Sequence, residues 1–230
     1  PEGKFVDADA SDFSAHTAPM PTDLAAALAA ASGVSESIGG VILPSGSAKL
    51  SLFSELLATH AAKPGFNIDA LDSGGRTLLQ QACMRRSQNQ AMLVQLLLDR
   101  KASASLADAT GSTALYYAAL SGCLAAVDLL KAAAGDGFGA VMDVANANGE
   151  TPLMAAAASG ATEVCGLLIA SGADLGARAT AGMHEGRGAL LIARCNNFTR
   201  TADFLKTKDP VALARAQAEA ARRSEVDGPR

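Results

Sequence analysis

Cysteine and histidine side chains are the residues of this sequence with the widest chemistry, because thiolates and imidazoles serve as nucleophiles, general bases and metal ligands. The cysteines are spaced 40, 42 and 30 residues apart and form no Cys-x-x-Cys pair; they are Cys83, Cys123, Cys165 and Cys195. The histidines are distant in sequence from one another and from every cysteine; they are His16, His60 and His184. This spacing suits no zinc site and no disulfide framework, so we expect no metal, no cofactor and no disulfide.

Other patterns that could support catalysis are incomplete. Residues 135–139 read Gly-Asp-Gly-Phe-Gly, without the Gly-x-Gly-x-x-Gly spacing or the Lys-Ser/Thr of a phosphate loop, so we expect an insertion between repeats there. No Gly-x-Ser-x-Gly nucleophile elbow occurs. His60 lies near a predicted helix end and His184 in a predicted loop, where we expect solvated or capping roles. We therefore predict no catalytic residue and no enzyme.

The composition favours closely packed helices. Hydrophobic residues make up 49% of the 230 residues, but aromatic residues only 4%, with no Trp. Helices of such a chain approach through small side chains rather than around large aromatic anchors. The 19 basic and 23 acidic residues give a net charge of −4, which argues against a nucleic-acid binder. The longest uncharged run, 109–127, is broken by glycine, serine and threonine, so we expect no membrane span.

The sequence repeats itself. Four segments share the frame Gly-x-(Thr/Gly)-x-Leu-x-x-Ala, in which the leucines are separated by 36, 38 and 37 residues; they are Leu79, Leu115, Leu153 and Leu190. A second apolar stretch follows each segment, as a repeat made of helix pairs requires. Thr151 is a natural helix N-cap, and Pro152 suits the first helical position, where its missing N–H costs nothing. We expect the four leucines to fill the seams between neighbouring repeats.

Thr-Pro-Leu-Met-Ala-Ala at 151–156, followed by Ser-Gly-Ala-Asp at 171–174, resembles the ankyrin repeat. The third repeat matches that family nearly throughout, the first two keep the frame without the proline, and the fourth is degenerate; the four are predicted at 72–107, 108–145, 146–178 and 179–208. The resemblance implies an all-α fold, an ankyrin-type helical repeat solenoid with short β-turn or hairpin loops and helical caps.

Flanking segments precede and follow the repeats of residues 72–208. Residues 1–21 are an acidic, proline-containing tail that we expect to be extended, and ordered only where a partner holds it. Residues 22–71 are predicted to form an atypical leading repeat with N-terminal cap helices. Asp209-Pro210 begins a predicted helix, so we expect residues 209–230 to be a C-terminal capping helix and tail that shields the last repeat from water.

The ankyrin resemblance also implies a binding surface. In that family the loop tips and the exposed side of the first helices line a concave face, on which protein partners dock. The matching positions of this chain are predicted protein-binding residues; they are Arg76, Gln81, Met84, Arg85, Arg86, Ser112, Tyr117, Leu120, Asn148 and Glu150. The degenerate fourth repeat offers Arg187, Ile192 and Asn196. The frame turns Tyr116 partly inward and leaves Tyr117 exposed. Because the three arginines would form a basic end beside the apolar Tyr117 and Leu120, we expect a partner with an acidic and apolar segment.

These observations predict a non-catalytic protein–protein interaction module, most simply a scaffold or accessory subunit of a larger protein assembly. A regulatory adaptor that recruits partners for transcription or degradation stays open as the alternative. A second recognisable module would favour the adaptor, and none is visible in the sequence. The cysteine spacing predicts an intracellular, reducing compartment. Because the first residue is Pro rather than Met, we expect the cytoplasm or an organelle interior after removal of a targeting peptide.

Overall fold

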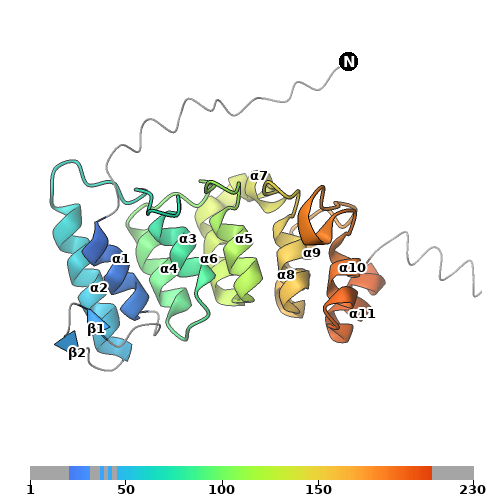
Figure 1. The fold of residues 1–230 in the computed structure, drawn as a ribbon, viewed down its shortest axis with the longest axis horizontal. Coiled ribbons are helices and arrows are strands. Elements are labelled where there is room, and N and C mark those ends of the chain that lie inside the picture. The colour runs from blue at the N-terminus through green and yellow to red at the C-terminus, as the bar shows by residue number, and fades with distance from the viewer. Residues whose placement is uncertain (1–20, 32–36, 39–40, 43–45, 209–230) are drawn as a thin grey trace, which may run out of the picture.

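The computed structural model describes residues 21–31, 37–38, 41–42 and 46–208. The predicted tail of residues 1–21 therefore lies outside the described residues except for Pro21, and the predicted terminal helix of residues 209–230 lies wholly outside them. The described elements form an elongated row of helix pairs, with α1 at one end and α11 at the other (Figure 1).

The first helix pair has a longer connection than the others. Helix α1 (Thr22–Ala31) packs against α2 (Gly46–Ala61). Between them lie the two-residue strands β1 (Ser37–Ile38) and β2 (Val41–Ile42), which pair in an antiparallel register. This pair occupies the place where the sequence predicts an atypical leading repeat.

Four further helix pairs follow. Each has a first and a second helix in contact with one another. The pairs are α3 (Leu78–Met84) with α4 (Gln90–Asp99), α5 (Ala114–Ser121) with α6 (Leu124–Ala134), α8 (Pro152–Ser159) with α9 (Thr162–Ala170), and α10 (Ala189–Cys195) with α11 (Thr199–Lys208). The glycine-rich segment after α6 forms a 3₁₀ turn, Gly135–Gly137, and the short helix α7 (Phe138–Met142), so the insertion predicted there is helical.

Local signals set the helix ends. Thr77, Thr113 and Thr151 have extended backbone and accept a hydrogen bond from the backbone N–H three residues later, at 3.3, 3.3 and 3.4 Å. Such caps satisfy one of the N–H groups that the first helical turn leaves free. Gly122 and Gly160 end α5 and α8 in the left-handed conformation, with φ of 77° and 74°.

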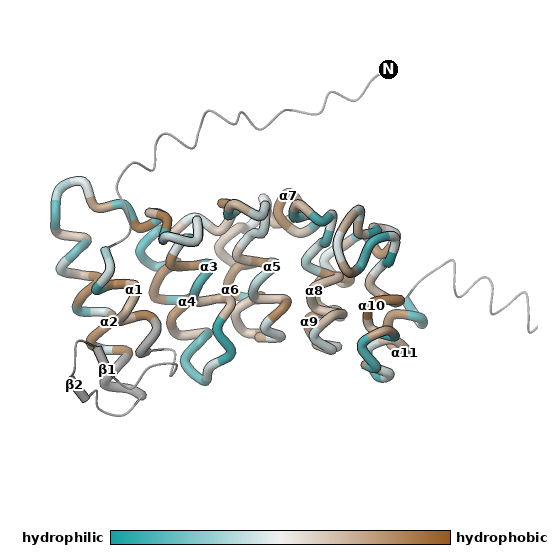
Figure 2. The backbone as a smooth tube through the Cα atoms, viewed as in Figure 1, coloured by the Kyte–Doolittle hydropathy of each residue, from teal (hydrophilic) through white to brown (hydrophobic). Residues whose placement is uncertain are grey.

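The helices form two layers. Helices α3, α5, α8 and α10 pack in succession and make up what we call the inner layer, and α4, α6, α9 and α11 make up the outer layer. Leu79, Leu115 and Leu153 are almost fully buried in the seams between repeats, whereas Leu190 in the last repeat is only half-buried. Hydrophobic residues run along most of the inner-layer helices, and hydrophilic residues gather in several connections and along α11 (Figure 2). The prediction of an all-α repeat solenoid is confirmed.

No helix among the described residues combines the length and the hydropathy that crossing a bilayer requires.

Candidate functional site

The loops that lead into the inner-layer helices share one geometry. We call these loops the fingers; they span residues 72–76, 108–112, 146–150 and 179–187. In each of the first three, an acidic or amide side chain at the base accepts hydrogen bonds from two backbone N–H groups, as Asp72 Oδ1 does from Gly74 at 2.8 Å and Arg76 at 2.9 Å. Asp108 and Asn146 do the same in the next two fingers. These side chains hold each finger in a tight turn.

The second oxygen of each aspartate ties the finger to its helix. Gln81 Nε2 donates to Asp72 Oδ2 at 3.0 Å, and the Tyr117 hydroxyl donates to Asp108 Oδ2 from the equivalent helix position. In the third repeat that position is alanine, and the finger base is Asn146, which donates to Glu150 instead. A finger aspartate is thus paired with a helix residue that carries a donor, and asparagine stands where no donor exists.

Contacts from one repeat to the next connect the fingers in series. Gln80 Nε2 reaches the carbonyl of Ser112 in the second finger at 3.2 Å. The Tyr116 hydroxyl, one repeat on, donates to Glu150 Oε2 in the third finger at 2.7 Å. The Asn148 carbonyl of the third finger accepts from the Thr180 N–H of the fourth at 2.8 Å. Each finger after the first is therefore positioned by the helix or finger before it.

The ionisation of these groups matches their contacts. Burial alone would raise the pKa of Asp108, but hydrogen bonds from Tyr117, from Thr110 and from the Ser112 N–H outweigh it, so the pKa is lowered. Burial and the bond to Asp108 raise the pKa of Tyr117. The carboxylate thus stays ionised and the phenol stays protonated at neutral pH, which suits a structural hydrogen bond rather than proton transfer.

Six of the predicted binding residues lie on the first finger, on α3 and the two residues after it, and on α5. The Arg76 guanidinium lies against the Met84 sulfur, with Nη1 and Sδ 3.2 Å apart, and its positive charge also acts on the Tyr117 hydroxyl. Arg86 Nη2 donates to the Leu120 carbonyl at 2.9 Å. With Arg85 beside Met84 and Arg86 in sequence, these residues form what we call the arginine patch; it consists of Arg76, Met84, Arg85, Arg86, Tyr117 and Leu120.

The cations of the arginine patch have no anionic partner within the described part of the chain, where the one ion pair within 4 Å is elsewhere. Arg85 is the most constrained of the three, because its Nε is buried without a hydrogen-bond partner and burial lowers its pKa. Met84 is 37% exposed. The patch therefore offers unpaired positive charge next to accessible apolar surface.

The structure corrects the predicted exposure of several residues. Gln81 and Ser112 are only 5% and 3% exposed and serve the hydrogen-bond network of the fingers, and Ile192 is fully buried. The contrast expected between the two tyrosines is also wrong, because Tyr116 and Tyr117 are both half-buried and each donates to a carboxylate.

The remaining predicted residues lie apart from the arginine patch. Asn148 is exposed and Glu150 half-buried, both on the third finger. Arg187 is half-buried at the end of the fourth finger. Asn196 is exposed just after α10, where its side chain donates to the Ala158 carbonyl at 3.0 Å. These positions line the same layer at increasing distance along the stack.

Sequence reasoning missed the form of the fourth finger. Its closing bond joins the Ala179 N–H to the Arg187 carbonyl, eight residues on, whereas the third finger closes over four. In this longer finger the side chain of Met183 is 81% exposed. His184 is only 7% exposed, and its Nδ1 is buried without a hydrogen-bond partner. Of the two roles predicted for His184, solvated or capping, the solvated one is wrong. The spacing of the frame glycines did not signal this, because the gap before the fourth glycine, 37 residues, is shorter than the 38 before the third.

The cysteines are separate from these contacts. All four thiols are free, Cys83 and Cys165 are buried and Cys195 is exposed. Burial raises the pKa of both buried thiols, that of Cys165 to about 12. Within the described ranges, no three His, Cys, Asp or Glu side chains are grouped in the manner of metal ligands.

A shallow depression of about 410 Å³ lies at the ends of the helices opposite to the fingers, around the turns between α8 and α9 and between α10 and α11. Two of its threonines bond within the protein, because Thr162 and Thr201 bond one another at 2.7 Å and Thr201 donates to the Gly160 carbonyl. Its lining also includes Glu163 and Arg200, which are exposed.

Comparison with known families agrees with the geometry. A model of three ankyrin repeats matches residues 45–138, and a model of a single ankyrin repeat matches residues 148–180. The first match begins just before α2, so it takes in the second helix of the leading pair. A search of curated proteins gave no match. Together the matched segments cover more than half of the sequence, and the capped helix pairs, inner-layer seams and fingers fall within them or follow the same frame. The chain therefore belongs to the ankyrin repeat family, whose repeats are protein–protein interaction modules.

Proposed function

We propose that this chain is a non-catalytic scaffold or accessory subunit of a larger protein assembly, and that its partner docks on the inner layer at the arginine patch. The observation that carries the proposal is the patch itself. Three guanidinium groups lack a carboxylate within the described residues, beside the exposed Met84 and the half-buried Tyr117 and Leu120. The ankyrin family supports this location, because its partners dock on the loop tips and first helices that carry the matching positions.

The chemistry of the patch supports a partner with an acidic and apolar segment. Arginine and tyrosine anchor interfaces often, since each combines area with directional hydrogen bonds. A carboxylate from the partner would pair with Arg85, whose Nε already lies buried without a partner. Such pairing would make association sensitive to salt, while burial of Met84 and Leu120 would slow dissociation.

The ordinary roles of the reactive groups support a non-catalytic function. Tyr117 and Asp108 hold a finger in place, and Cys83 and Cys165 are buried with raised pKa values. Four free thiols also support our proposal of a reducing intracellular compartment.

Affinity purification with site-specific cross-linking tests the proposal. A photo-reactive benzoylphenylalanine replaces Met84 in one variant and Met92 in another; Met92 is 58% exposed on α4 in the outer layer and serves as the matched control. We expect cross-links from position 84, not from 92, to an acidic segment of one partner. Recovery of that partner in stoichiometric amounts supports a scaffold subunit, whereas transient, substoichiometric recovery supports the adaptor.

Affinity measurements with the identified partner then test the residues. Tyr117→Ala should weaken binding by about 2 kcal/mol or more, as loss of an anchor does. Tyr117→Phe keeps the ring and loses only the bond to Asp108, so it separates contact area from finger structure. Arg85→Glu should weaken binding, and Arg200→Glu, an exposed position on α11, should not. Unchanged binding in both Tyr117→Ala and Arg85→Glu would place the interface elsewhere.

A further inference from the structure

The sequence that precedes α1 has the chemistry that the arginine patch lacks. Residues 1–20 carry four carboxylates against a single lysine, together with two phenylalanines. Residues 5–13 read Phe-Val-Asp-Ala-Asp-Ala-Ser-Asp-Phe, with one phenylalanine at each end and three aspartates between them. This stretch is an acidic and apolar segment of the kind that we propose for the partner.

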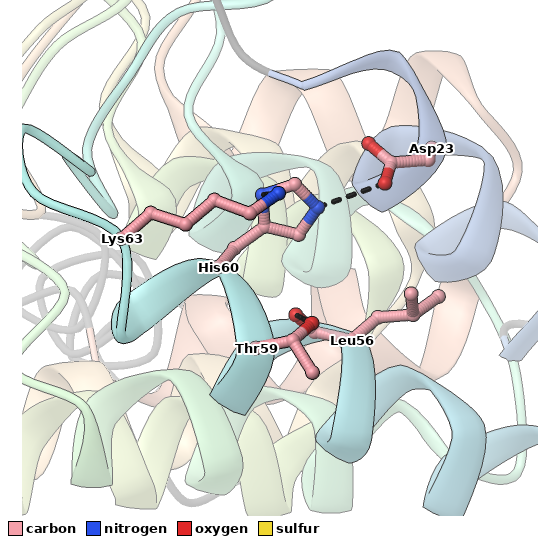
Figure 3. Close-up of polar contacts among 5 residues, drawn as sticks. All are labelled: Asp23, Leu56, Thr59, His60 and Lys63. Carbon is pink, nitrogen blue, oxygen red and sulfur yellow. Dashed lines mark hydrogen bonds and ion pairs between the residues drawn. The ribbon is translucent and has the colours of Figure 1, made fainter.

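The start of α1 is anchored to the end of α2. His60, near the end of α2, bonds Asp23, in the first turn of α1, with Nε2 and Oδ2 2.8 Å apart (Figure 3). The bond to His60 lowers the pKa of Asp23, so the carboxylate is ionised at neutral pH. Residues 62–71 connect α2 to the first finger, and α1 packs against α3, the helix that follows this finger. The start of α1 lies on the same side of the stack as the loops that lead into the inner-layer helices (Figure 1).

Residues 5–13 lie far enough before Pro21 to reach from the start of α1 to the arginine patch. Neighbouring helices lie about 8–10 Å apart, so the patch on α3 and α5 is about 10–20 Å from α1. The nine residues from Asp12 to Pro21 span up to about 30 Å when extended. Asp7, Asp9 and Asp12 can therefore all reach the patch arginines, with the phenylalanines opposite its apolar side chains.

We propose that residues 5–13 of the same chain occupy the arginine patch and that the partner must displace them. This inference rests on the docking surface proposed above. A tethered segment acts at an effective concentration on the order of 1 mM, so an intrinsic dissociation constant of about 100 μM is enough to keep the patch mostly occupied. The apparent affinity of the partner is then lowered about tenfold. The segment thereby acts as a built-in competitor that admits only partners with a stronger acidic anchor.

Methionine methyl resonances of the full-length chain test the proposal without any partner. Met84 reports on the patch, and the exposed Met92 and Met183 are reference signals elsewhere on the molecule. The test variant is D7N/D9N/D12N. The control variant, D128N/D136N/D203N, changes the net charge equally at three exposed aspartates. At low salt we expect the Met84 resonance to move in the test variant, and to move in the same direction when about 0.5 M NaCl screens the wild type. The reference signals and the control variant should show no such change.

Two results would overturn the inference. One is a Met84 resonance that is identical in the wild type and in D7N/D9N/D12N at low salt. The other is a shift at Met92 and Met183 as large as that at Met84, which would mean that the segment contacts the stack without preference. With a partner in hand, D7N/D9N/D12N should bind it about tenfold more tightly, and unchanged affinity would also count against the inference. If Met84 is insensitive to the segment while Arg85→Glu still abolishes partner binding, the inference fails and the proposed function stands. If Met84 responds but partner binding ignores Arg85→Glu and Tyr117→Ala, the proposed function fails instead.

Discussion

Two glycines at equivalent places in the fingers allow a matched test of how the fingers contact one another. Gly149 is the next-to-last residue of the third finger and Gly186 that of the fourth, with φ of 72° and 71°. An alanine in this left-handed conformation costs about 1–2 kcal/mol, because its Cβ crowds the backbone. Gly149→Ala and Gly186→Ala therefore share this cost, together with the same change in the flexibility of the unfolded chain.

The two variants differ in what the new methyl group meets. At Gly186 nothing lies within 4 Å of the added Cβ. At Gly149 it would lie 2.5 Å from Thr180 Oγ1 and 2.7 Å from the Thr180 backbone nitrogen. The fourth finger must then move and weaken the bond from the Thr180 N–H to the Asn148 carbonyl, which contributes about 0.5–1.5 kcal/mol. Steric overpacking costs about 1–3 kcal/mol more. We expect Gly186→Ala to lower the free energy of unfolding by about 1–2 kcal/mol. Gly149→Ala should lower it by about 2–4 kcal/mol more than Gly186→Ala does.

Urea denaturation followed by circular dichroism at 222 nm measures both values, and the Met183 methyl resonance reports movement of the fourth finger directly. We expect that resonance to shift in Gly149→Ala. Equal loss of stability in the two variants, with Met183 unmoved in Gly149→Ala, would show that the third and fourth fingers do not pack as described here.

Three further predictions concern the core, the titration of the fingers and the thiols. Leu153→Ala should lower the free energy of unfolding by about 2–5 kcal/mol because Leu153 is fully buried, and Leu190→Ala should lower it less because Leu190 is half-buried. Urea denaturation of both variants measures these losses, and equal losses would contradict the burial of Leu153 in a seam between repeats. Because the pKa of Asp108 is lowered in the folded protein, its carboxylate stabilises the fold at pH values above the ordinary pKa of 3.8, and this stability is lost as the pH falls through the lowered pKa. The free energy of unfolding, measured by urea denaturation at several acidic pH values, should therefore fall less steeply with decreasing pH in Asp108→Asn than in the wild type. Identical pH profiles of the two proteins would contradict this role of Asp108. In native protein Cys195 should react rapidly with a thiol reagent and Cys83 only on unfolding, with four thiols found in denaturant; rapid native reaction of Cys83 would contradict its burial.

Sequence reasoning succeeded where the physical cause is local. Thr151 and Pro152 start α8 because the cap bond spans three residues and the proline needs no N–H donor at that place. Gly122 ends α5 because the left-handed conformation is open to glycine without strain. Both causes lie within one helical turn of the residue concerned, so the residue types and their spacing are sufficient to predict them.

Burial of polar groups could not be read in the same way. Ser112 has the position of a loop-tip residue in the frame, yet it is buried because Gln80, from the preceding repeat, bonds its carbonyl. His184 is buried because the fourth finger is longer than the others, and the frame offered no template for that insertion. Leu190 has the same place in the frame as Leu153 but is more exposed, because it belongs to the last repeat of the frame.

The sequence by itself determined the repeat frame, the helix pairs with their caps and the residue types available for binding. Only the tertiary structure decided which of those residues meet. Arg86 and Leu120 are 34 positions apart and come together because α3 and α5 stack side by side. Tyr117 faces Asp108 because the finger folds back over its own helix. The physical reason is that each repeat is completed by its neighbours, so exposure and contact depend on the stack and not on the repeat alone.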